Sequence, residues 1–95
     1  MSSHAFTDAE GQAFEVTIGV TGEITDVVGP WPDTPSAEFA LRGVLPPHTT
    51  PAGVPDSVRE TALARGLEVC FYDAVNCRTC FCDGTGRIVR CANMC

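Results

Sequence analysis

The residues best suited to chemistry lie at one end of this sequence, where all six cysteines fall between positions 70 and 95. Their order follows the pattern C-x6-C-x2-C-x-C-x8-C-x3-C. Thiols at such spacings can bond to one another, hold a metal ion or act as nucleophiles. An even number of them in a short chain favours disulfides formed in an oxidising compartment.

The length of the chain gives disulfides a clear physical purpose. A chain of 95 residues buries only about 60–65% of its unfolded surface, so its apolar core alone gives marginal stability. A disulfide that closes a loop of roughly 15 residues adds about 3 kcal/mol to the free energy of unfolding in the chain-entropy description. We therefore expect the cysteines to be structural crosslinks.

A β-hairpin is expected within the cysteine region. Residues 83–90 read DGTGRIVR, where an aspartate and two glycines favour a turn and the following residues alternate as in a strand. Cys80 and Cys82 would then project from one face of the preceding strand toward the partner strand that carries Cys91. This arrangement suits short crosslinks, although six cysteines permit many pairings.

The cysteine pattern resembles the framework of pacifastin-type protease inhibitors and the related half of von Willebrand factor type C modules. Both show C-x-x-C-x-C, a glycine soon afterwards and then two further cysteines. The likeness covers residues 70–95. It implies the disulfides Cys70–Cys82, Cys77–Cys95 and Cys80–Cys91.

The same resemblance gives a candidate inhibitor loop. In pacifastin-type inhibitors the protease-contacting bond lies between the last two cysteines, which here enclose Ala92, Asn93 and Met94. Asn93 would occupy the primary specificity position, where trypsin-like pockets favour a cation and chymotrypsin-like pockets an apolar group. The first cysteine spacing is also shorter than is usual in that family, and Arg78 stands where asparagine is typical. Despite these departures, the resemblance implies serine protease inhibition as an alternative function.

Two metal-binding alternatives rest on parts of the same pattern. CDGTG is similar to the glycine-rich zinc repeats of DnaJ-type chaperones, although Thr79 stands where those repeats have a cysteine. C-x-x-C-x-C is similar to the metal claw of nitrile hydratases, with Phe81 between the last two cysteines. A further alternative is a modified peptide with its leader. We expect no metal and no other cofactor, and zinc ligation is the second alternative.

No catalytic arrangement is visible in the sequence. Neither His4 nor His48, the two histidines, lies near a serine or cysteine in a recognisable catalytic motif. Nothing fixes two carboxylates at a working separation, and so short a chain is too small for a deep pocket of its own. We expect a protein that is not an enzyme.

The N-terminal part is expected to be mainly β. Alternating apolar residues along 13–20 (AFEVTIGV) and a turn at Gly22 predict a β-hairpin over residues 13–28. A third strand is predicted in AEFALRGVL (37–45). Prolines mark GPWPDTP (29–35) and PPHTTPAGVP (46–55) as extended connectors.

Trp31, the single tryptophan, lies between two prolines in the first connector. Its side chain could pack on the sheet as a plug, or it could contact a protein partner. Packing on the sheet is the favoured interpretation.

One short helix is predicted in PDSVRETALARG (55–66). Ser57 and Glu60 have the spacing of a capping box, Gly66 is placed to end the helix, and an apolar stripe would be formed by Val58, Ala62 and Leu63. A strand follows in LEVCFYDAV (67–75), with Leu67, Val69 and Phe71 on one face and Cys70 and Tyr72 on the other.

Taken together, these elements predict a small, mostly β (α+β) fold with antiparallel hairpins, one short helix and a disulfide-rich C-terminal hairpin. We expect two parts. Residues 1–55 would form an acidic β-hairpin region with Pro-rich connectors. Residues 56–95 would contain the helix and the cysteine module.

The charge distribution limits the partners of the chain. The net charge is −6, and residues 1–41 contain no Lys or Arg, so we expect no nucleic-acid partner. No run approaches the roughly 20 apolar residues of a membrane span, so membrane insertion is not expected. The start MSSHAFTDAEGQAF has no visible signal-peptide pattern, which contrasts with the oxidising compartment that the cysteines favour.

The main functional prediction is a non-enzymatic, disulfide-stabilised structural or interaction module with one or more protein partners, including copies of itself. An acidic front, Pro-rich segments and a crosslinked end suit a small subunit of a larger extracellular, cell-surface or virion-type assembly.

Overall fold

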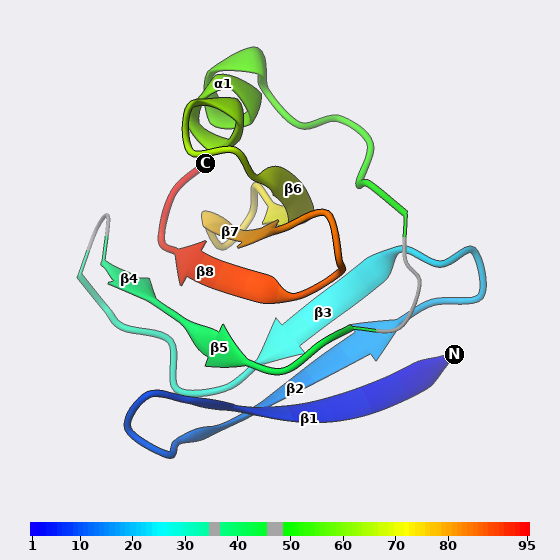
Figure 1. Ribbon diagram of the computed structural model, residues 1–95, viewed down its shortest axis with the longest axis vertical. Coiled ribbons are helices and arrows are strands. Elements are labelled where there is room, and N and C mark those ends of the chain that lie inside the picture. Colours follow the sequence, from blue (N-terminus) through cyan, green and yellow to red (C-terminus); the bar gives the residue numbers. More distant parts are fainter. Residues whose placement is uncertain (35–36, 46–48) are drawn as a thin grey trace.

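The computed structural model describes residues 1–34, 37–45 and 49–95. In these residues eight strands and one helix form two four-stranded antiparallel sheets, with the helix outside the second sheet (Figure 1). The strand order is β3-β2-β1-β5 in the first sheet and β4-β8-β7-β6 in the second. The predicted fold class is therefore confirmed. The elements are Ser2–Asp8 (β1), Ala13–Ile18 (β2), Ile24–Val28 (β3), Glu38–Phe39 (β4), Leu41–Arg42 (β5), Asp56–Ala64 (α1), Glu68–Asp73 (β6), Arg78–Cys82 (β7) and Ile88–Ala92 (β8).

The predicted N-terminal hairpin is confirmed as β2 and β3. Inward-facing apolar residues alternate along β2, and Gly22 takes a positive φ of 86° in the turn, where glycine avoids a steric penalty. The Gly22 amide donates to the Gly19 carbonyl at 3.0 Å and closes that turn.

Strand β1 is an element that the sequence pattern did not predict. It pairs with β2 from Ser2 opposite Ile18 to Thr7 opposite Ala13. Phe6 is its one buried apolar residue, so its sequence lacks the alternation that marks β2. β1 is therefore held in the sheet by its backbone pairing with β2 and not by an apolar pattern of its own.

The predicted third strand within residues 37–45 is divided between the two sheets. β4 pairs with β8, with Phe39 opposite Cys91, whereas β5 pairs with β1, with Leu41 opposite Asp8. Only Ala40 separates the two short strands. This segment therefore joins the two sheets along one side of the molecule.

Helix α1 ends as predicted but begins differently. Gly66 has a φ of 70° after its end, and the Leu67 amide donates to the Ala62 carbonyl at 2.9 Å. The predicted capping box is wrong, because Pro55 is the N-cap residue and no side chain caps the helix. In the described residues no helix is long and apolar enough to cross a membrane.

The predicted apolar stripe of α1 and the predicted alternation of β6 each need a correction. Val58 and Ala62 are buried, but Leu63 is 69% exposed and so lies outside the buried part of the stripe. A bulge between Val69 and Phe71 shifts the register of β6, so these two residues pack in different clusters.

The core has two parts, one on each face of the second sheet. The larger cluster contains residues of both sheets and four of the cysteines, and its members are Phe6, Phe14, Val16, Ile18, Ile24, Val27, Trp31, Leu41, Leu45, Cys70, Phe71, Cys80, Cys82, Ile88 and Cys91. The smaller cluster beneath α1 contains Val54, Val58, Ala62, Val69 and Phe81. Residues from both predicted parts, 1–55 and 56–95, contribute to each cluster.

Of the two predicted connectors, residues 29–34 and 49–55 are described, and they contain no named strand or helix. The predictions for residues 35–36 and 46–48, which include His48, lie outside the described residues.

Candidate functional site

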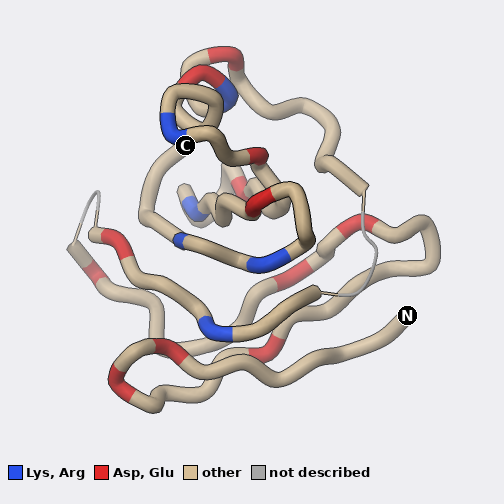
Figure 2. Tube along the Cα trace, in the orientation of Figure 1, with Lys and Arg blue, Asp and Glu red and all other residues tan. Residues whose placement is uncertain are grey.

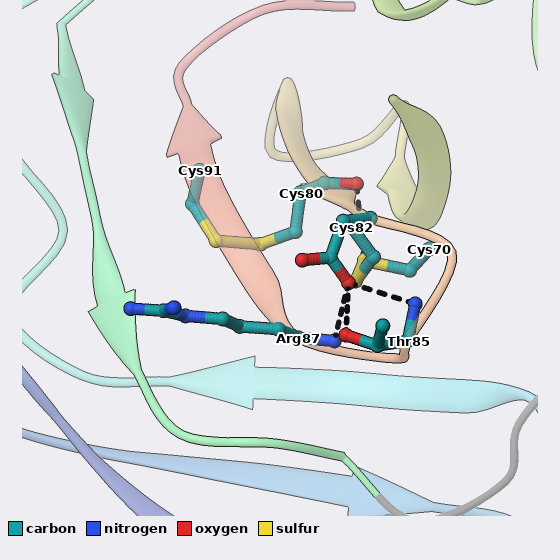
Figure 3. Close-up of a disulfide and its surroundings, with 7 residues drawn as sticks. Cys70, Cys80, Cys82, Thr85, Arg87 and Cys91 are labelled. Atoms are coloured by element: carbon teal, nitrogen blue, oxygen red, sulfur yellow. Dashed lines mark hydrogen bonds between the residues drawn. A yellow bond between two sulfur atoms is a disulfide. The ribbon is translucent and has the colours of Figure 1, made fainter. Parts of the chain in front are cut away.

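Disulfides join all six cysteines in three pairs, Cys70–Cys82, Cys77–Cys95 and Cys80–Cys91. These are the pairs that the resemblance to pacifastin-type frameworks implies. Figure 3 shows two of them, one linking β6 to β7 and the other linking β7 to β8. The second sheet is therefore crosslinked across all three of its longer strands.

The metal-binding alternatives are wrong, because no cysteine thiolate is left to ligate an ion. A metal-bound cysteine is a thiolate, whereas each of these sulfurs is bonded to another sulfur. The described residues also contain no group of three or more His, Cys, Asp or Glu side chains placed to hold a metal. Neither the zinc module nor the metal claw is compatible with this structure.

The three disulfides differ sharply in their burial. Four cysteines, Cys70, Cys80, Cys82 and Cys91, are at most 1% exposed and belong to the larger core cluster. Cys77 is half-buried and Cys95 is exposed. Two bonds thus form part of the apolar interior, and the third lies at the surface.

The turn between β7 and β8 is organised by Asp83. Its Oδ1 accepts from the Thr85 hydroxyl at 2.6 Å, from the Thr85 amide at 2.9 Å and from the Arg87 amide at 3.1 Å (Figure 3). These donors, the Thr85 hydroxyl above all, lower the pKa of the Asp83 carboxyl. The carboxylate therefore fixes the hairpin that places Cys91 opposite Cys80.

A second aspartate organises the turn between β6 and β7. Asp73 Oδ2 accepts from the Asn76 side-chain amide at 2.8 Å, and its Oδ1 accepts from the backbone amides of Val75 and Asn76. The Asn76 side chain is the largest cause of the lowered pKa of Asp73. This turn positions Cys77 immediately before β7.

Trp31 fills the end of the larger core cluster. Its indole is 7% exposed, and Nε1 donates to the Val27 carbonyl at 2.8 Å. The ring meets Phe14 and Phe39 edge to face, with centroids 6.5 and 4.9 Å away. Such burial matches the plug interpretation and leaves little indole surface for the alternative, a contact with a protein partner.

Arg78 covers part of the Trp31 ring. Its Cζ lies 4.9 Å from the ring centroid, within the range of a cation–π contact. Beside Arg78 is a surface cleft of about 350 Å³, lined by Pro32, Asp33, Asn76, Cys77, Arg78 and Asn93. We call this the Cys77 cleft; the surface disulfide contributes Cys77 to its wall.

The candidate inhibitor loop is held against the body of the molecule. Ala92 is 1% exposed within β8. The Asn93 side-chain amide donates to the Pro32 and Thr34 carbonyls, and its backbone amide donates to Ala37. Met94 is half-buried and packs against the smaller cluster.

The acidic N-terminal part meets the arginines of the C-terminal part at Glu38. Glu38 Oε1 is 3.1 Å from Arg65 Nη1, and Oε2 is 3.0 Å from Arg90 Nη1. Figure 2 shows the wider pattern, with acidic residues spread over the first sheet and its turns. Both ion pairs are more than one-third exposed, so each contributes little to stability.

Sequence reasoning identified the cysteines and Trp31 but missed the Cys77 cleft. The Asn93 side chain and the Pro32 carbonyl are 61 residues apart in sequence, and no local pattern links them. The contact of Arg78 with Trp31 likewise joins two elements that only the complete fold brings together.

Comparisons with protein-family models, with curated proteins and with solved structures found no match. The fold and its crosslinks define a small, disulfide-rich, mostly β domain. Three disulfides fit an extracellular or otherwise oxidising environment.

Proposed function

We propose that this chain is a non-enzymatic structural module that binds protein partners, as a small subunit of a larger extracellular, cell-surface or virion-type assembly. The observation that carries the proposal is the outer edge of β1, which offers hydrogen-bonding groups to another strand. The core supports it, because Phe6 of β1 packs in the same buried cluster as four disulfide-bonded cysteines.

The pairing of β1 leaves much of one edge available. β1 pairs with β2 along its length but with β5 only at Thr7 and Asp8. The Asp8 amide donates to the Gln12 carbonyl, on the β2 side. The backbone N–H and C=O groups of successive residues point to opposite edges of a strand. Those of Ser3 and Ala5 therefore point to the edge of β1 that lies away from β2. In the described residues no strand pairs with that edge between residues 2 and 6.

The composition of this edge favours association. Residues 2–7 contain no Lys, Arg, Asp, Glu or Pro, which are the residues that commonly protect an edge strand from pairing. In a chain with a net charge of −6, this stretch is one where two molecules can meet with little repulsion. A partner strand added here would extend the first sheet.

Several polar side chains already have structural partners, which supports a non-enzymatic function. Asp73 and Asp83 accept hydrogen bonds within their own turns, and Asp8 accepts from the Glu10 and Gln12 amides. His4 lies 3.1 Å from the Ser2 hydroxyl, on the exposed start of β1 and away from the Cys77 cleft.

Two proline substitutions test the proposal. Ala5→Pro removes an amide that points outward, so it should weaken association while the β1–β2 ladder is kept. His4→Pro removes an amide that points toward β2 and should lower the melting temperature of the monomer. Light scattering coupled to size exclusion, on the full chain and on its native source, measures association. A parent chain that is monomeric in both would overturn the proposal.

A further inference from the structure

The surface disulfide Cys77–Cys95 differs from the other two in ways that bear on its chemistry. Cys95 is exposed and Cys77 is half-buried, whereas the four remaining cysteines are at most 1% exposed. Thiol–disulfide exchange requires an attacking thiolate to reach one sulfur of the bond. Of the six cysteines, Cys95 is the one most exposed to that attack.

The backbone at Cys77 is also unusual. Its φ is 56°, and it is the one non-glycine residue with a positive φ in the described residues. A side chain with a Cβ seldom adopts this conformation, and residues held in it cluster at functional sites. The preceding turn, fixed by Asp73 and Asn76, keeps Cys77 in this position at the wall of its cleft.

The cleft is lined by a cationic residue as well as by Cys77 of the disulfide. Arg78 follows Cys77 directly, lines the same cleft and is held over the Trp31 ring. A neighbouring guanidinium stabilises a thiolate and attracts an anionic ligand. Asp33 also lines the cleft, so Arg78 has to offset one carboxylate there.

We propose that the Cys77–Cys95 disulfide is an exchange site for a small anionic thiol of the glutathione class. The external thiolate attacks Cys95 Sγ and forms a mixed disulfide with it. The Cys77–Cys95 bond breaks, and its electron pair leaves on Cys77 Sγ as a thiolate beside Arg78. One disulfide is consumed and one is formed, so the step needs no other oxidant or reductant.

The fold is built to survive this exchange. Asn93 donates to the Pro32 and Thr34 carbonyls, and the Thr79 hydroxyl donates to the Met94 carbonyl at 2.7 Å. These contacts hold the segment before Cys95 in place without the covalent bond. The two buried disulfides are unaffected, so the modified chain should retain its structure.

The first test treats the oxidised full chain with reduced glutathione at neutral pH, traps free thiols with iodoacetamide and maps the peptides. We expect one glutathione on Cys95 and one alkylated thiol on Cys77, with an unchanged circular dichroism spectrum. Adducts on the buried cysteines at a comparable rate, an adduct on Cys77, or no adduct under conditions that open an exposed reference disulfide would overturn the proposal.

The second test separates charge from exposure. Arg78→Gln should lower the exchange rate with glutathione, relative to that with neutral mercaptoethanol, by about threefold, as expected for one charge at close range in water. Arg87→Gln, which removes a charge from the other turn, should leave the ratio unchanged. Arg78→Lys keeps the charge and should preserve the ratio, which guards against a folding defect in Arg78→Gln. An unchanged ratio in folded Arg78→Gln would refute the function given to Arg78.

Discussion

Removing the Cys80–Cys91 disulfide should lower the free energy of unfolding more than removing Cys77–Cys95, although the latter closes the longer loop. The sequence separations are 11 and 18 residues. The chain-entropy description alone gives about 2.8 and 3.2 kcal/mol, so it favours Cys77–Cys95 by about 0.4 kcal/mol.

Burial reverses the order of the two expected losses in the free energy of unfolding. Cys80 and Cys91 are both 0% exposed, and replacing them by alanine removes two sulfurs from the packed core. Each loss resembles that of a buried methylene group, about 0.8 kcal/mol, together with part of a cavity, so the pair adds about 2 kcal/mol. The expected losses are therefore about 5 kcal/mol for Cys80→Ala with Cys91→Ala and about 3 kcal/mol for Cys77→Ala with Cys95→Ala.

Urea unfolding followed by the fluorescence of the buried Trp31 measures this difference. For a small protein, 2 kcal/mol corresponds to a difference of about 1–2 M in the urea midpoint. Cys70→Ala with Cys82→Ala is the matched control, because its cysteines are equally buried and lie 12 residues apart. If the surface pair costs as much as either buried pair, loop length and not burial sets the stability of the module.

Two further predictions concern a cap and a carboxylate. Ser57→Ala should change the free energy of unfolding by less than about 0.5 kcal/mol, because no side chain caps α1; thermal unfolding measures this, and a loss near 1 kcal/mol would indicate a cap. The folded-state pKa of Asp83 is lowered, so its carboxylate stabilises the fold above its unfolded pKa, and that contribution disappears as the pH falls through the folded pKa. Asp83→Asn should therefore lose less stability than the parent between about pH 5 and pH 2, and equal losses in melting temperature would contradict this reasoning.

The parts of the fold that could be predicted are those with a local signal. Alternation along Phe14, Val16 and Ile18 identified β2, and Gly22 and Gly66 identified a turn and a helix end. These features depend on the side-chain period of a strand or on the conformational freedom of one residue. Either signal can be recognised within a few consecutive residues.

The missed features depend on distant partners. β1 has one buried apolar residue, Phe6, and is held in the sheet by its backbone pairing with β2. The bulge at Cys70 changes which side of β6 each residue faces, and no signal within residues 67–75 marks it. Although Ser57 and Glu60 have the spacing of a capping box, Pro55 occupies the cap position.

The candidate site likewise has one part that could be predicted from the sequence and one part that could not. The cysteines were recognised from their spacing, and the expected pairs came from a resemblance. The Cys77 cleft could not be recognised, because Asn93, Arg78 and Pro32 meet only after both sheets have formed. Chemistry at a surface disulfide depends on such neighbours as much as on the sulfurs themselves.

The segment 38–42, which belongs to both sheets, also sets an order for biosynthesis. Its residues leave the ribosome well before Ile88–Ala92, the strand that must dock against Glu38 and Phe39. Phe39 pairs with Cys91, so the residues up to Phe39 remain without this partner strand until residues 88–92 have been synthesised. Complete folding and correct oxidation therefore require residues 88–92 to have been synthesised, and we expect the two sheets to unfold in a single cooperative transition.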